Sequence, residues 1–161
     1  MLGEADVLQL RHTIEAAFPP TVFDGEVSSA DREPWSEEIE DDLDLRGNLR
    51  GRSWDRIPAH LIDRHADGLA LLTPPAFAAF LPAWLIRSLD NDADAKNVRE
   101  FTIYQFCEVQ GPTKLDAEVA AMLRAHVMKR YRSLNDIQLA AVRGGSWPRA
   151  RAKGLRLSPR L

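Results

Sequence analysis

The residues best suited to chemistry in this sequence lie in the segment HLIDRH, where His60 and His65 flank Asp63. Two metal ligands share a helix face at a spacing of four residues, or of three when one is a carboxylate. The five-residue spacing of the histidines turns them about 140° apart. His60 and Asp63 can still share a face, so a metal-dependent hydrolase stays open. The pattern favours a structural His65, bonded at the edge of a core.

The adjacent carboxylates Asp41 and Asp42 are the second candidate for metal or acid–base chemistry. Neighbouring helical residues point about 100° apart, so the two carboxylates need an outside partner to converge. A solvated acidic face is the simpler interpretation. The chain has no P-loop, dinucleotide fingerprint or nucleophile elbow, and the GGSW at residues 144–147 resembles a helix stop. We therefore expect no catalytic residue, no metal site and no cofactor.

The chain is polarised in charge although its formal net charge is only −3. Residues 31–44 contain eight acids and one arginine, a net charge of −7. Residues 137–161 contain six basic residues and no acid, a net charge of +6. An acidic helix can steer a basic protein toward it, whereas a basic tail can bind phosphates while an aromatic ring stacks on a base. The tail can also fold back over the acidic segment.

From this polarity we expect a non-enzymatic interaction protein that presents an acidic surface to a basic protein partner. Toxin-neutralising immunity proteins are the analogous class. The expected partner-binding residues are Trp35, as an apolar anchor, with Glu37, Glu38, Glu40, Asp41 and Asp44. Local packing of Trp35 is an equal alternative. The competing function is a nucleic-acid-binding accessory protein that uses Trp147, Arg149, Arg151, Lys153 and Arg156.

The length of 161 residues, with 45% apolar and 28% charged residues, matches a single globular domain. The longest uncharged stretch, residues 68–86, is interrupted by prolines, which opposes a membrane span. A single cysteine, Cys107, fits a reducing compartment, and the first residues lack the basic start of a signal peptide. We expect a cytoplasmic protein, and its oligomeric state stays open.

The apolar spacing predicts an all-α fold of five to seven helices packed around one central apolar helix. The expected helices cover residues 4–18, 36–47, 55–72, 74–89, 116–131 and 135–142. A single domain is expected to span residues 1–144, followed by a basic, mobile tail at residues 145–161.

Local signals set the expected helix ends. Gly47 is expected to close the second helix, and Asp55 to cap the third, with Pro58 in its first turn. The third helix is expected to bury one face, formed by Ile57, Leu61, His65, Leu69 and Leu72. Thr73 is expected to cap the central helix, with Pro74 at its first position.

Two later segments are less regular. Residues 98–109 mix β-branched and aromatic residues without a clean period, so a short strand and a short helix both stay open, and the helix is favoured. A helix capped by Asp116 is expected to bury Val119, Leu123, Val127 and Tyr131.

Part of the chain resembles a family of small bacterial domains with no assigned activity, which share a spaced Trp, Pro, Leu, His and Leu-Thr-Pro-x-Ala-Phe-x-x-Phe-Leu-Pro-Ala pattern. The matching positions here are Trp54, Pro58, Leu61, His65, Leu72, Thr73, Pro74, Ala76, Phe77, Phe80, Leu81, Pro82 and Ala83. The segment SLNDIQLAAV is similar to a later helix-starting segment of that family, through Leu134, Asn135, Gln138 and Val142. The resemblance covers roughly half the chain and implies a fold rather than a function. After Gly145 this sequence departs from the family, because it turns basic where the family ends on an apolar helix.

Overall fold

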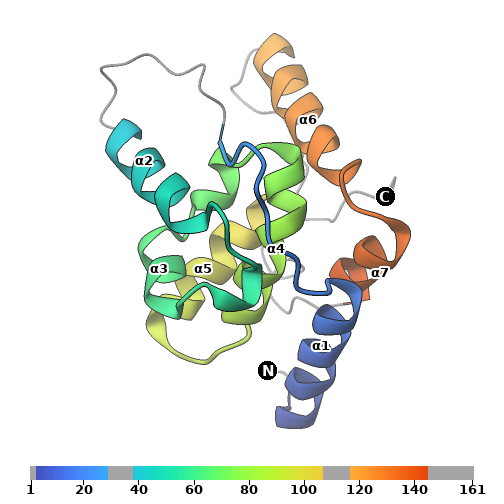
Figure 1. The fold of residues 1–161 in the computed structure, drawn as a ribbon. Coiled ribbons are helices and arrows are strands. Elements are labelled where there is room, and N and C mark those ends of the chain that lie inside the picture. Colours follow the sequence, from blue (N-terminus) through green and yellow to red (C-terminus); the bar gives the residue numbers. More distant parts are fainter. Residues whose placement is uncertain (1–2, 29–37, 107–116, 145–161) are drawn as a thin grey trace.

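The computed structural model describes residues 3–28, 38–106 and 117–144, drawn in colour in Figure 1. Within these ranges the fold is all-α, with seven α-helices, two short 3₁₀ turns and no strand. The predicted all-α class is therefore confirmed. The expected tail at residues 145–161 lies outside the described ranges. The helices are α1 (Glu4–Ala17), α2 (Glu38–Leu49), α3 (Ala59–Arg64), α4 (Pro74–Arg87), α5 (Ala93–Tyr104), α6 (Ala117–Tyr131) and α7 (Asp136–Gly144).

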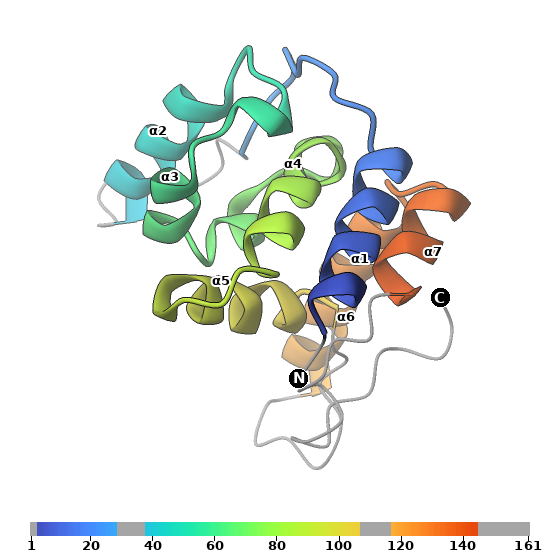
Figure 2. The same ribbon diagram turned by 90° about the horizontal axis from the view of Figure 1, so that it is seen from below.

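Helix α4 is the centre of the fold. It contacts α1, α3, α5 and α6, and it lies between them in both views (Figures 1 and 2). Thr73 caps it, since the Ala76 amide donates to Thr73 Oγ1 at 3.4 Å, and Pro74 occupies the first turn. Phe80 and Trp84 are both 0% exposed. The uncharged stretch of the sequence is therefore part of a packed core around these two side chains.

The prediction of a single helix at residues 55–72 is wrong. The chain forms a 3₁₀ turn (Trp54–Arg56), then α3, and then a second 3₁₀ turn, η2 (Gly68–Leu71). Pro58 is the extended N-cap of α3, so it precedes the helix instead of lying in its first turn. Asp55 accepts a hydrogen bond from Ser53 at 2.5 Å and caps no helix. The five predicted face residues are nevertheless all buried, so their spacing indicated burial correctly but not a continuous helix.

The prediction that Gly47 closes the second helix is also wrong. Helix α2 continues to Leu49, and the chain leaves the helical path at Gly51, whose φ is +70°. This left-handed conformation suits glycine because it has no Cβ. The Gly51 amide donates to the Phe23 carbonyl at 2.9 Å, which ties the end of α2 to the segment after α1. Ser36, the expected N-cap of this helix, lies outside the described residues.

The ambiguous segment at residues 98–109 is helical as far as Tyr104, so the favoured alternative is confirmed there, while residues 107–109 lie outside the described ranges. The helix begins earlier than expected, because Asp92 caps it: the Ala95 amide donates to Asp92 Oδ1 at 2.8 Å. Ala95, Val98 and Thr102 then bury one face of α5.

The last two helices lie close to their predicted positions. Tyr131 of α6 is buried as expected and Val127 is partly buried, whereas Asp116 and the side chains of Val119 and Leu123 are outside the described set. Helix α7 begins with a reciprocal cap, in which the Gln138 amide donates to Asn135 Oδ1 at 2.9 Å and the Asn135 amide donates to Gln138 Oε1 at 3.0 Å. Helix α7 packs against α1, so the first and last described helices are neighbours (Figure 1).

Candidate functional site

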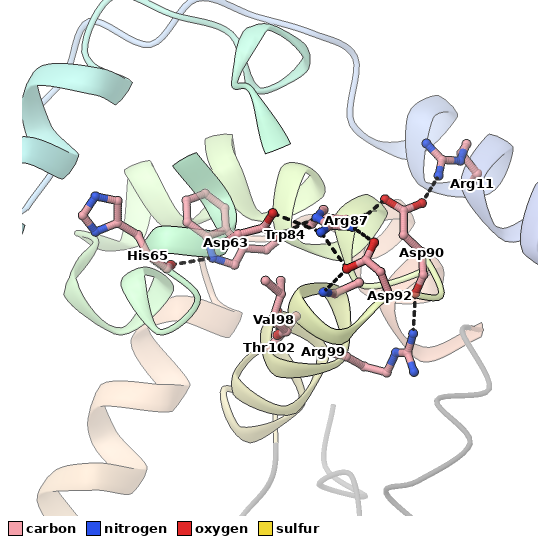
Figure 3. Close-up of polar contacts among 11 residues, drawn as sticks. Arg11, Asp63, His65, Trp84, Arg87, Asp90, Asp92, Val98, Arg99 and Thr102 are labelled. Atoms are coloured by element: carbon pink, nitrogen blue, oxygen red, sulfur yellow. Dashed lines mark hydrogen bonds and ion pairs between the residues drawn. The ribbon is translucent and has the colours of Figure 1, made fainter. Parts of the chain in front are cut away.

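Arg87, at the end of α4, is the most heavily bonded charged residue among those described (Figure 3). Its guanidinium donates to both oxygens of Asp63, at 2.7 and 3.0 Å, and to both oxygens of Asp92, at 2.7 and 2.9 Å. A fifth bond, at 3.0 Å, reaches Asp90. These bonds use every N–H of the side chain. The hydrogen bonds to Asp92 and Asp63 raise the pKa of Arg87 above its usual value, and those from Arg87 lower the pKa of Asp92 to about 2.

The same cluster joins four helices. Arg11 of α1 donates to Asp90 at 3.1 Å, and Arg99 of α5 donates to the Asp90 carbonyl at 2.8 Å (Figure 3). Arg99 also donates to the Ser88 carbonyl at 2.7 Å. Asp63 comes from α3. Arg87 is 9% exposed, and the side chain of Asp63 is 20% exposed, whereas those of Asp90 and Asp92 are 43% and 53% exposed, so only the Arg87 end of the cluster is shielded from solvent. The cluster therefore acts as a cross-link between α1, α3, α4 and α5.

This arrangement decides between the two interpretations of HLIDRH. Both carboxylate oxygens of Asp63 are bound by Arg87, so Asp63 is committed to the fold and does not pair with the exposed His60. Within the ranges that the structure describes, no three His, Cys, Asp or Glu side chains are grouped so as to hold a metal ion. The hydrolase alternative relied on the Asp63 carboxylate, and Arg87 already binds that carboxylate.

His65 has the structural position that its sequence context favoured. The residue is 3% exposed, and its Nε2 lies 2.9 Å from Asp44 Oδ2 of α2. Its backbone carbonyl accepts a hydrogen bond from Trp84 Nε1 at 3.1 Å (Figure 3). The hydrogen bond from His65 holds the pKa of Asp44 below its usual value, and Arg64 also reaches Asp44 at 3.2 Å. His65 thus connects α2 to the core helix α4.

Arg130 of α6 is a second buried cation. Its Nη2 donates to the carbonyls of Ala70 and Leu72, at 2.5 and 3.2 Å, and its guanidinium lies 5.5 Å from the centre of the Phe77 ring. Burial lowers the pKa of Arg130 to about 10. The carbonyls belong to the corner between η2 and the Thr73-Pro74-Pro75 turn, so Arg130 secures that corner and has no exposed surface to offer a ligand.

The structure locates the predicted acidic surface only in part. Trp35 and Glu37 lie outside the described residues. Glu38, Glu40 and Asp41 belong to the described backbone of α2, but their side chains are outside the description. Asp44 is the predicted site residue whose side chain is described, and it turns toward His65. The residues of the competing nucleic-acid site, Trp147, Arg149, Arg151, Lys153 and Arg156, all lie outside the described ranges.

Helix α2 is attached through its apolar side. Leu45 and Leu49 are both 0% exposed, whereas Leu43, on the opposite side of the helix, is 57% exposed. A groove of about 330 Å³ lies between the last turns of α2 and the preceding loop, lined by Asp24, Gly25, Glu26, Val27, Ser28, Arg46 and Arg50. The sequence interpretation missed Leu43 and the groove. The signal for Leu43 was its position two residues before the buried Leu45, which places it on the other side of a helix.

None of the helices in the described ranges combines the length and the apolar character needed to cross a bilayer. Comparison with protein-family models, with curated protein sequences and with solved structures gives no match.

Proposed function

We propose that this chain is a non-enzymatic interaction protein whose helix α2 presents an acidic surface to a basic protein partner. The observation that supports this proposal is the way α2 is attached. Buried Leu45 and Leu49, with the Asp44–His65 contact, hold one side of an acid-rich helix against the core, and Leu43 is left exposed on the other. An acid-rich helix at the periphery can attract a basic protein through complementary charge.

The positions of the other candidate groups also favour binding over catalysis. Asp63 is committed to Arg87, and His65 is buried against Asp44. Toxin-neutralising immunity proteins of bacteria are the analogous class, and the cytoplasm is the compartment we propose. The partner-binding residues in this proposal are Trp35, Glu37, Glu38, Glu40, Asp41 and Asp44.

The test compares two charge-reversed variants of the full chain as baits in an extract of the producing cells. Glu40→Lys/Asp41→Lys changes α2, whereas the matched control Glu4→Lys/Glu15→Lys makes the same change in charge at exposed positions on α1, on the far side of the molecule (Figure 1). We expect the wild type and the α1 variant to retain a basic protein that salt releases, and the α2 variant to lose it. Equal retention by all three baits would contradict the proposal.

The competing function is nucleic-acid binding through the basic residues near the C-terminus. The salt dependence of binding distinguishes it from binding of a basic protein. Binding of random-sequence RNA that falls steeply between about 50 and 200 mM salt, and that is unchanged by Glu40→Lys/Asp41→Lys, would favour the nucleic-acid interpretation. Removal of residues 145–161 should then abolish it.

A further inference from the structure

Helix α6 is attached to the core through one side of its second half. Arg130 and Tyr131 are each 4% exposed, and Tyr131 Oη donates to the Phe106 carbonyl at 3.0 Å. Val127, one turn before Tyr131, packs against the core and is partly buried. In Figure 1 the first turns of α6 extend beyond the other described helices. The attachment of α6 therefore uses one side of the helix and leaves the other side exposed.

The exposed side of α6 carries a regular row of residues. Met122, Ala125, Lys129 and Arg132 alternate at spacings of three and four residues, and all four are exposed. Arg132 continues the row past the end of α6, because its amide donates to the Met128 carbonyl at 3.1 Å. Residues at this spacing lie along one side of a helix, as in the contact line of a coiled coil. These four residues are called the α6 face below.

The first half of the α6 face is apolar. Met122 is 67% exposed. Ala125 and the neighbouring Ala121 are exposed and small, so another helix can approach closely here. Methionine is enriched in protein interfaces, since its flexible side chain adapts to the surface of a partner. Nucleic acids are bound mainly through their phosphates, which would leave this apolar half uncovered. The composition therefore favours a protein as the occupant.

The second half of the α6 face is cationic. Lys129 and Arg132, with Arg124 at the edge of the face, are exposed, and their side chains form no hydrogen bond or ion pair with the part of the chain that the structure describes. The positive charge also acts on His126, on the other edge. Desolvation lowers the pKa of His126, and the charges of Arg130 and Lys129 lower it further. Unpaired cations beside an apolar surface are complementary to carboxylates beside an apolar stripe.

We infer that the α6 face is the docking surface for an acidic amphipathic helix of a partner protein. This inference goes beyond the proposed function, which concerns the acidic α2, and does not depend on it. The partner helix places its apolar side chains against Met122 and Ala125. Its carboxylates lie against Lys129 and Arg132 and away from Glu118, at the opposite end of α6, because like charges repel.

The experiment measures binding of three synthetic helical peptides to the full chain by fluorescence anisotropy, at low and at physiological salt. The first peptide has a leucine stripe beside a row of glutamates. The second replaces the leucines by glutamine, and the third replaces the glutamates by lysine. The protein variants are Met122→Gln, which changes the apolar half of the α6 face, and Lys129→Glu/Arg132→Glu, which reverses the charge of the other half.

Each variant has a matched control elsewhere on the protein. Ile137→Gln makes the same kind of change at an apolar side chain of α7 that is 70% exposed. Lys96→Glu/Arg143→Glu makes the same change in charge at exposed positions on α5 and α7. All the substituted side chains are exposed, so thermal denaturation should give similar Tm values for the variants and their controls.

We expect the first peptide to bind best and its binding to weaken about tenfold in Met122→Gln, because an apolar contact is lost. Lys129→Glu/Arg132→Glu should weaken binding by at least about tenfold at low salt and by less at physiological salt, where charges are screened. Both controls should bind as the wild type does. In the wild type, saturation with the first peptide should raise the pKa of His126 in an NMR titration, since carboxylates nearby favour the protonated ring.

Each contrary outcome overturns the inference for a different reason. Equal binding of the glutamine peptide would exclude the apolar contact, and equal binding of the lysine peptide would exclude an acidic partner. Absence of binding by the first peptide at low salt, or an unchanged titration of His126, would exclude the α6 face as the docking surface. Random-sequence RNA that binds more tightly than the first peptide, and is lost in Lys129→Glu/Arg132→Glu, would make nucleic acid the occupant. A wild-type dimer that the same variant dissociates would make a second copy the occupant.

Discussion

The corner between α4 and α5 and the attachment of α2 use acidic residues in opposite ways. At the corner, three aspartates close around the shielded Arg87, and each oxygen of Asp63 and Asp92 receives a hydrogen bond. At α2 the contact with the core is mainly apolar, through Leu45 and Leu49, and the described acid Asp44 is 40% exposed in its side chain. Acids thus hold the fold together in one region and leave a charged helix at the periphery in the other.

The difference shows how position decides the role of a carboxylate. A carboxylate that faces a buried guanidinium contributes strongly to stability, because loss of one partner leaves the other charge in a poor solvent. An acid on an exposed helix face contributes little to stability, so it can be selected for binding instead. Sequence density of acids alone does not separate the two cases.

The largest expected effect comes from breaking the Arg87 cluster. Arg87→Met should lower the free energy of unfolding by about 2–4 kcal/mol, since it removes five charge-assisted hydrogen bonds, although the half-exposed Asp90 and Asp92 stay solvated. Urea denaturation measures the loss. Arg64→Met is the matched control, because Arg64 makes an exposed ion pair with Asp44, and it should cost less than about 1 kcal/mol. Equal costs for the two variants would show that the cluster is not a special cross-link.

A smaller effect is expected where the two regions meet at Gly68. A Cβ at this position would lie 3.2 Å from His65 Cβ, 3.2 Å from Leu45 Cδ2 and 3.4 Å from Trp84 Cζ2. Gly68→Ala should therefore lower the free energy of unfolding by about 1–3 kcal/mol by overpacking. It should also increase amide hydrogen exchange in α2 more than in α5. Uniform acceleration of exchange in both helices would argue that α2 has no separate attachment.

The pH response of Asp92 tests the corner through the ionisation of a single carboxylate. Its pKa is lowered from 3.8 to about 2 in the folded protein, so its ionised form stabilises the fold above about pH 4. This contribution is lost as the pH falls from about 4 toward 2. Carboxyl NMR titration should find the depressed pKa in the wild type and a return toward the usual value in Arg87→Met. A titration of Asp92 that is identical in both proteins would rule out Arg87 as the cause.

The smallest expected effect concerns Asp44. Asp44→Asn keeps an acceptor for His65 but removes the charge of a partly exposed carboxylate, so the free energy of unfolding should fall less than in Gly68→Ala. The loss should diminish above about 0.5 M salt if it is electrostatic. Thermal denaturation with and without salt measures both values. A cost as large as that of Arg87→Met would erase the contrast between the two regions.

The sequence predicted which side chains are buried better than it predicted the path of the backbone. The spacing of Leu61, His65 and Leu69 identified a buried face, because burial follows from the positions of apolar side chains along a helix-like period. It did not show that the helix covers only Ala59–Arg64 and ends at His65. Breaks depend on single backbone positions, such as the extended Pro58 and the left-handed Gly51, whose effect on the path appears only when their neighbours are placed.

The candidate site was harder to predict because its contacts join distant residues. Asp63 and Arg87 are 24 positions apart, and Asp44 and His65 are 21 apart, so residue type alone did not indicate which acids have internal partners. Asp44 was predicted as a surface acid and in fact contacts a buried histidine. Leu43 was overlooked within an acidic segment, although its place opposite Leu45 was readable from the helical period.

The packing of α1 against α7 constrains the order in which the chain can fold. The first helix meets a main neighbour that is separated from it by more than a hundred residues, so this contact has a high loop-closure cost and forms late. During synthesis α1 must wait until nearly the entire domain has left the ribosome. Premature termination before Asn135 would therefore uncover the part of the first helix that packs against α7, while its contact with α4 remains, which makes shortened products prone to aggregation and degradation.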